Sequence, residues 1–311
     1  MLFIFMLILT IFMAFSSTSL FFIWLSLEIN MMVFLPLLIS KNQLFSSDTA
    51  MKYFISQSLA SILFLFSFLT NPMMEMSSFL LMMSILFKMG LAPFHSWMIS
   101  IFSTSNYMSL LFLGTIQKII PLMIISYLLN LYFYSPIIIF INLFMISFMF
   151  SNYNSIRMIL FMSSINNSLF MIMGAISSNI WMMYMTIYII LNLATLFSLD
   201  FLNISKASQI KDLDFNSKSL LSFLFLNLAG IPPFLGFLQK LLIIKEIMNM
   251  EMIFAAFLLI LMSLMVLYAY LMITLNSYSN SKSHLNISLP VSVMSLLLFS
   301  LTGLIPITQM F

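Results

Sequence analysis

Long runs of apolar residues, separated by short polar stretches, cover almost the whole 311-residue chain. A membrane-spanning helix needs about 20 mostly apolar residues, because the hydrocarbon core is about 30 Å thick and a helix rises about 1.5 Å per residue. Dividing the chain at its polar, proline and glycine residues gives eleven candidate spans, of which the first is short. They cover residues 2–16, 20–39, 51–70, 77–102, 106–130, 135–153, 156–176, 179–202, 218–247, 252–275 and 287–308.

This pattern predicts an all-α polytopic membrane protein with a single transmembrane domain over residues 1–311. The composition agrees, since 63% of the residues are hydrophobic and 6% are charged, against about 45–50% and about 25% in soluble domains. The net charge of +3 is not gathered into a basic face, so we expect no nucleic-acid partner. The absence of cysteine excludes disulfides and cysteine-ligated iron–sulfur clusters in this chain.

The charged residues of the connections predict which way the spans point. Basic residues accumulate on the cytoplasmic or matrix side of a membrane. The connections after the even-numbered spans hold seven of them: Lys41, Lys52, Arg157, Lys206, Lys211, Lys218 and Lys282. The opposite connections hold one basic residue, Lys245, together with Glu75, Glu246 and Glu251. We therefore expect the N-terminus on the positive side and the C-terminus on the other.

Two of the candidate spans are interrupted by glycine and proline. The fourth contains "KMGLAPFHSW" and the ninth contains "LAGIPPFLGFLQK". Proline removes a backbone donor and clashes with the preceding turn, so each span should be a discontinuous helix whose freed carbonyls face protein or water. Each interrupted span is the fourth of five, which predicts two inverted repeats, residues 1–130 and 135–275, followed by a C-terminal helix within residues 287–311. Such repeats are typical of ion transporters, although proline kinks alone are common in membrane helices.

Four charged residues lie well inside the spans: Glu28, Lys88, Lys118 and Lys240. Each costs about 2.5–3.5 kcal/mol at the centre of a bilayer. They could form static ion pairs, and Lys240 could extend to an interface, but three lysines exceed one glutamate. Burial favours the neutral form of an amine, so such lysines are suited to releasing and taking up protons. His95, just beyond the first interruption, could pass protons on or lie at the interface.

Six segments carry a resemblance to a known family. They are "WLSLEINMMVFLPLL", "MKYFISQSLAS", "KMGLAPFHSW", "GTIQKIIPL", "IRMILFMSSINNS" and "AGIPPFLGFLQKLLI", in family order along almost the whole chain. Together they resemble the NADH:ubiquinone oxidoreductase chain 2 family, the antiporter-like subunits of respiratory complex I.

This resemblance implies a proton-translocating subunit of the membrane arm, in the mitochondrial inner membrane, with its N-terminus in the matrix and its C-terminus in the intermembrane space. By motif, Glu28, Lys88, Lys118 and Lys240 would form the proton relay. The family pattern "SSIxHxGW" reads "SSINNSLF" here, so Asn167 replaces a histidine. An amide can orient water but does not ionise.

The resemblance also implies the cofactors and partners. We expect no cofactor on this chain, because NADH, FMN, the iron–sulfur clusters and ubiquinone would be bound by other subunits of the same enzyme. The expected partners are other membrane-arm and accessory subunits and phospholipid, including cardiolipin. Two alternatives remain open: a cation/proton antiporter subunit, and a structural scaffold of the membrane arm whose lysines carry no protons.

Overall fold

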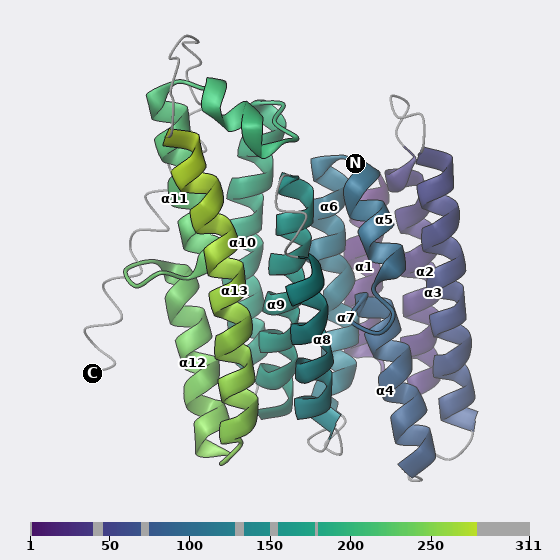
Figure 1. The fold of residues 1–311 in the computed structure, drawn as a ribbon. Helices are drawn as coiled ribbons and strands as arrows, with labels where there is room; N and C mark the ends of the chain where they lie inside the picture. The colour runs from purple at the N-terminus through teal and green to yellow at the C-terminus, as the bar shows by residue number, and fades with distance from the viewer. Residues whose placement is uncertain are drawn as a thin grey trace. The chain divides into compact units, whose positions relative to one another are not determined.

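The computed structural model describes residues 2–39, 46–69, 75–127, 134–149, 155–177 and 180–278, and these ranges are almost entirely helical (Figure 1). The elements are α1 (Leu2–Ser16), α2 (Leu20–Leu38), α3 (Ser46–Leu69), α4 (Glu75–Met89), α5 (Ser96–Thr104), α6 (Tyr107–Gly114), α7 (Ile116–Tyr127), α8 (Ser135–Met149), α9 (Ile156–Ser177), α10 (Ile180–Phe201), the 3-10 helix η3 (Ala207–Asp212), α11 (Phe215–Ala229), α12 (Leu235–Asn249) and α13 (Ile253–Tyr278). Within the described ranges, pairing of β type is limited to one isolated bridge, between Ser155 and Lys206. The predicted all-α class is confirmed.

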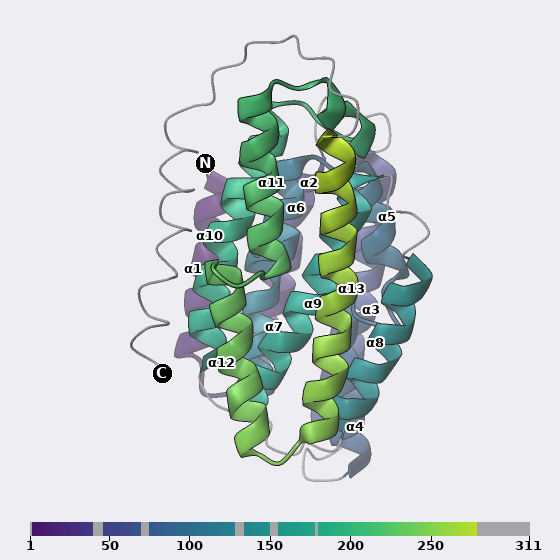
Figure 2. The same ribbon diagram turned by 60° about the vertical axis from the view of Figure 1, so that its left-hand side comes forward.

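The chain divides into two compact units, Met1–Asn142 and Leu143–Phe311. In the first unit, α3 packs against α2, α4 and α5, while α7 packs against α1, α4 and α6. In the second unit, α9 packs against α10, α12 and α13, and α11 packs against the same three helices. Within this unit α11 and α12 follow one another along nearly one line, with α13 beside them (Figures 1 and 2).

Six helical segments are long and apolar enough to cross a membrane: Leu20–Leu38, Ser47–Leu69, Tyr107–Tyr127, Ile156–Ser177, Ile180–Phe201 and Ile253–Tyr278. Three shorter apolar helices cover Leu2–Ser16, Met76–Met89 and Ser135–Met149. The protein is therefore a multi-pass membrane protein. The count of eleven spans stays a prediction, and its last candidate, residues 287–308, lies outside the described residues.

Both predicted interruptions are real breaks, and their backbones follow the same pattern. Gly90, which follows α4, has φ +65°, and Gly230, which follows α11, has φ +84°. Glycine adopts this left-handed conformation without the clash that a Cβ atom would cause. At these two positions the left-handed glycine therefore ends the helix.

Each break closes with the same hydrogen bonds. At the first, the N–H of Gly90 donates to Phe87 O at 3.2 Å, and the N–H of Leu91 donates to Leu86 O at 3.1 Å. The corresponding distances at the second break are 3.1 Å, from Gly230 N to Asn227 O, and 3.4 Å, from Ile231 N to Leu226 O. This pair of bonds is the Schellman motif, which satisfies carbonyls that a helix end would otherwise leave free.

An asparagine side chain supports each break on its far side. In the first unit, Asn142 Oδ1 of α8 accepts the N–H of Ala92 at 2.9 Å. In the second, Asn227 Oδ1 accepts the N–H of Gly236 at 3.0 Å. A Cβ atom at Gly236 would overlap with the carbonyl oxygen of Asn227, so glycine is what lets α12 begin this close to α11.

Three boundaries differ from those predicted. The span predicted over 106–130 is divided at Thr115, whose φ of −121° and ψ of −78° are not helical. Lys52 and Lys218, assigned from the sequence to connections, lie in α3 and α11. The assignment of Lys218 to a connection is wrong, since it lies in α11 and its side chain is only 2% exposed. Helix α11 begins at Phe215, directly after its N-cap Asp214.

We predict that Gly230→Ala destabilises the second break. An alanine there would adopt an unfavourable left-handed conformation, which costs about 1–2 kcal/mol, and its Cβ atom would lie 2.9 Å from Lys240 Nζ. The thermal unfolding midpoint of the purified protein should fall. Gly174→Ala is the control, because Gly174 lies inside α9 and the nearest atom to its new Cβ would be Ile243 Cδ1 at 3.2 Å. Equal midpoints for the two variants would contradict the prediction.

Candidate functional site

The first unit holds three of the four predicted relay residues. Lys88 lies in the last turn of α4, directly before the break, and is 7% exposed. Lys118 lies on α7, which packs against α4, and is 2% exposed. Glu28 on α2 is half-buried rather than enclosed, and it interacts electrostatically with Lys88. The structure therefore brings together Glu28 and Lys88, and it places Lys118 on a neighbouring helix.

Helix α3 contacts both lysine-bearing helices through two side chains one turn apart. Gln57 Nε2 donates to the backbone carbonyl of Lys88 at 3.3 Å. The hydroxyl of Tyr53 donates to Gln117 Oε1, on the residue preceding Lys118, at 3.3 Å. Residues four apart share one face of a helix, so α3 fixes α4 and α7 from a single face.

His95 lies at the N-terminus of α5, just after the break, where its Nδ1 is 3.2 Å from the carbonyl oxygen of Pro93. Its ring is partly exposed. Among the described residues, no hydrogen bond joins His95 to Lys88, and its part in a relay stays a prediction.

In the second unit, Lys240 reaches back from α12 to the end of α11. Its ammonium donates to the carbonyl oxygen of Ala229 at 2.6 Å and to that of Leu228 at 3.5 Å. A cation is favourable at the C-terminal end of a helix, where the unpaired carbonyls carry partial negative charge. The side chain is 5% exposed. The alternative that Lys240 extends to an interface is therefore wrong.

Asn167 lies within a buried network between α9 and α10. The hydroxyl of Tyr184 donates to Asn167 Oδ1 at 2.8 Å. The hydroxyl of Tyr188 is hydrogen-bonded to the side chains of Asn167 and Asn192. Tyr184, Tyr188 and Asn192 are four residues apart on one stripe of α10, and all are buried.

Comparisons with known proteins identify the family of this chain. The family described as NADH:quinone oxidoreductase/Mrp antiporter, TM matches residues 68–266. NADH-ubiquinone oxidoreductase chain 2 of Aedes aegypti is 33% identical over 321 residues, covering 93% of this chain and 94% of the relative. The chain 2 protein of Locusta migratoria is 32% identical over 278 residues, covering 86% and 81%. This chain belongs to the NADH-ubiquinone oxidoreductase chain 2 family.

Solved structures share the fold of this chain 2 family member. A chain of respiratory complex I from Thermus thermophilus aligns with a TM-score of 0.82 at 20% identity, covering 98% of this chain and 78% of that chain. A chain of the Mrp complex from Dietzia sp. aligns with a TM-score of 0.75 at 14% identity, covering 86% and 58%. The shared fold thus extends from the oxidoreductase to an antiporter complex.

Several polar residues that bind helix α4, Gln117 or Asn167 were not predicted from the sequence of this chain 2 family member to belong to the site. They are Tyr53, Gln57, Trp97, Tyr184 and Tyr188. The spacing of four residues between Tyr53 and Gln57, and between Tyr184 and Tyr188, was the available signal. The partners of these side chains come from other helices, so the sequence did not indicate which groups they bind.

Two buried amides in the second unit have no hydrogen-bond partner among the described residues. They are Asn166 of α9 and Gln239 of α12, and in each the amide oxygen and the amide nitrogen both lack a partner. Gln239 directly precedes Lys240, and α9 packs against α12. Buried polar groups are nearly always hydrogen-bonded, often by internal water. Each of these amides is therefore suited to bind an internal water molecule.

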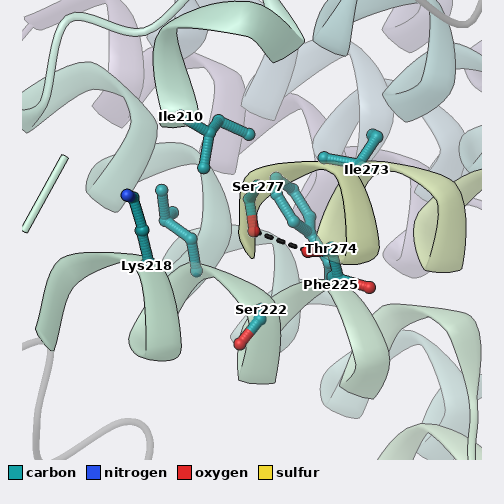
Figure 3. A pocket seen from close by; sticks show the side chains of 8 residues that line it. Ile210, Lys218, Ser222, Phe225, Ile273, Thr274 and Ser277 are labelled. Carbon is teal, nitrogen blue, oxygen red and sulfur yellow. Dashed lines mark hydrogen bonds between the residues drawn. The ribbon is translucent and has the colours of Figure 1, made fainter. Parts of the chain in front are cut away.

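Lys218 lines a narrow crevice between η3, α11 and α13 that has no room for a water molecule (Figure 3). Its ammonium points away from Ser277, whose hydroxyl donates to the carbonyl oxygen of Thr274 at 2.6 Å (Figure 3). The crevice is therefore too small for a small-molecule ligand, whose sites typically enclose ~300–1,000 Å³. Among the described residues there is also no group of three or more metal-ligating His, Asp or Glu side chains.

We predict that Asn167→Leu lowers the thermal unfolding midpoint, because the buried hydroxyls of Tyr184 and Tyr188 would lose an amide partner. An unsatisfied buried polar group costs about 1–3 kcal/mol. Adding Tyr184→Phe to Asn167→Leu should recover part of the loss, since it removes one of the hydroxyls left without a partner. Thermal unfolding of the single and double variants tests this. Additive losses would show that the network contributes little.

Proposed function

We propose that this chain translocates protons across the mitochondrial inner membrane as an antiporter-like membrane-arm subunit of NADH:ubiquinone oxidoreductase. The observation that carries the proposal is the burial of Lys88 and Lys240 beside two matching helix breaks. In hydrocarbon, buried lysines of this kind are costly and are typical of proton and ion pathways. Membership of the chain 2 family supports the coupling of this transport to electron transfer by other subunits.

The electrostatic interaction between Glu28 and Lys88 is the proposed coupling element of the first unit. The attraction between two opposite charges falls with their separation. A change in the distance between the two groups would therefore change the affinity of Lys88 for a proton. For scale, moving one elementary charge against 100 mV costs about 2.3 kcal/mol. Lys118, on the neighbouring helix, is the next proposed proton carrier.

Lys240 is the proposed proton carrier of the second unit. Its ammonium is stabilised by the carbonyls of Leu228 and Ala229. Release of the proton would weaken these bonds, because hydrogen bonds from a charged donor are roughly twice as strong as neutral ones. The Schellman bonds that the two breaks share, and the division of the chain at residues 142 and 143, support the inverted repeats predicted for residues 1–130 and 135–275.

The proposed setting follows from the family. The relatives named above are chains of NADH-ubiquinone oxidoreductases, and the solved chains of similar fold come from multi-subunit complexes. We therefore propose that NADH, FMN, the iron–sulfur clusters and ubiquinone bind elsewhere in the complex. The proposed partners are other membrane-arm and accessory subunits and phospholipid, including cardiolipin, with the N-terminus of this chain in the matrix.

A second candidate, cation/proton antiport, is favoured by the likeness of the fold to a chain of the Mrp complex. A sodium-dependent proton flux in liposomes that contain this chain alone would support it. A purely structural scaffold is the third reading, and the effect of replacing the buried lysines distinguishes it from proton transport.

We predict that Lys118→Met lowers the number of protons translocated per electron in the assembled complex, because methionine fills the site of the buried amine but carries no proton. Assembly should be largely retained, since an apolar side chain is well accommodated in a buried position. The measurement is acidification of proteoliposomes against NADH oxidation. Lys52→Met is the matched control, because the side chain of Lys52 is exposed on α3. A native ratio for Lys118→Met would favour the scaffold.

A further inference from the structure

The two helix breaks have similar backbone conformations, but different side chains donate hydrogen bonds to their carbonyl oxygens. Counting back from the left-handed glycine, Lys88 at the first break corresponds to Leu228 at the second. The carbonyl of Lys88 accepts a hydrogen bond from the neutral side chain of Gln57. The carbonyl of Leu228 accepts one from the ammonium of Lys240. Equivalent carbonyls are thus satisfied by a neutral donor in one unit and by a cation in the other.

A second neutral donor completes the first break. Trp97 Nε1, on α5, donates to the carbonyl oxygen of Phe87 at 3.2 Å. Its ring packs edge-on against Tyr53 with 6.0 Å between centroids. Gln57 is 6% exposed and lies one turn beyond Tyr53, which is tied to Gln117. Both donors are therefore held in place by packing that does not depend on the charge state of a lysine.

The position of Lys88 makes these neutral donors important. A lysine in the last turn of a helix commonly uses its ammonium to hydrogen-bond the last carbonyls of that helix. In this chain the carbonyls of Lys88 and Phe87 accept hydrogen bonds from Gln57 and Trp97. Within the part of the chain that the structure describes, the Lys88 ammonium makes no hydrogen bond, and it interacts electrostatically with Glu28.

We propose that Gln57 and Trp97 are positioning residues, which hold the carbonyl end of α4 and thereby keep the Lys88 ammonium available to Glu28. At the second break no such pair is present among the described residues, and Lys240 holds the helix end itself. Loss of Gln57 would leave the carbonyl of Lys88 without its side-chain donor, and loss of Trp97 would leave the carbonyl of Phe87 with the N–H of Gly90 as its donor. In either case the Lys88 ammonium would bind the helix end and withdraw from Glu28. This inference rests on the proposed proton translocation through Lys88.

The test compares Gln57→Leu, Lys88→Met and the double variant in the assembled complex, reconstituted in liposomes. Gln57→Leu keeps the side-chain volume and removes the N–H donor, so the protons translocated per electron should fall toward the value of Lys88→Met. In the Lys88→Met background, Gln57→Leu should cause no further loss, because no ammonium remains to be captured. Gln57→His, which retains an N–H donor, should restore most of the native ratio.

Two further variants complete the comparison. Trp97→Phe keeps a ring against Tyr53 and removes only the N–H donor, so it should lower the same ratio, and it decides the matter if Gln57→Leu does not assemble. Ser58→Ala is the control on α3, because the Ser58 hydroxyl is exposed and donates only to the carbonyl of Ile55.

The outcomes separate this inference from the proposed function. A native ratio in Lys88→Met would overturn both. Loss in Lys88→Met with a native ratio in Gln57→Leu, or in Trp97→Phe, would overturn the positioning role and leave the proposed function standing. An equal additional loss from Gln57→Leu with and without Lys88 would indicate that Gln57 only supports packing, and would also overturn the positioning role.

Discussion

A backbone carbonyl inside the hydrocarbon region must find a hydrogen-bond donor within the protein, since the lipid offers none. This constraint acts most strongly at the two breaks, where α4 and α11 end between other helices. The Schellman bonds satisfy part of each helix end, and side chains must supply the remaining donors. The choice of donor then decides what a nearby lysine can do, because an ammonium that caps a helix is no longer independent of the backbone.

The same residue type consequently has different surroundings in the two units. The ammonium of Lys88 interacts electrostatically with Glu28, while the neutral donors Gln57 and Trp97 bind carbonyls at the end of its helix. Lys240 has no such separation, because its ammonium is 2.6 Å from the carbonyl oxygen of Ala229. The charge of Lys88 is thus sensitive to Glu28, whereas the charge of Lys240 is tied to the geometry of the break between α11 and α12.

The sequence predicted the breaks because their causes are local: a glycine ends each helix and prolines follow within three residues. It also predicted that Lys88, Lys118 and Lys240 are buried, because each is surrounded by apolar residues in the chain. It could not predict the donors to the breaks, since Gln57 is 31 residues from Lys88 and Asn142 is 50 from Ala92. Lys218 was misplaced because its neighbours are polar, while its burial arises from η3 and α13.

Asn167 illustrates how one substitution alters the chemistry of a whole interface. The bond from Tyr184 directs Oδ1 of Asn167 toward that hydroxyl, which leaves the amide N–H group of Asn167 for Tyr188. An amide oxygen and an amide N–H group cannot exchange a proton in the way that the two nitrogens of an imidazole can. The network between α9 and α10 therefore joins the two helices by hydrogen bonds of fixed direction. If protons cross the second unit as proposed, they pass Asn167 through other groups, and the buried amides of Asn166 and Gln239, which have no partner among the described residues, are suited to hold the water that such a path requires.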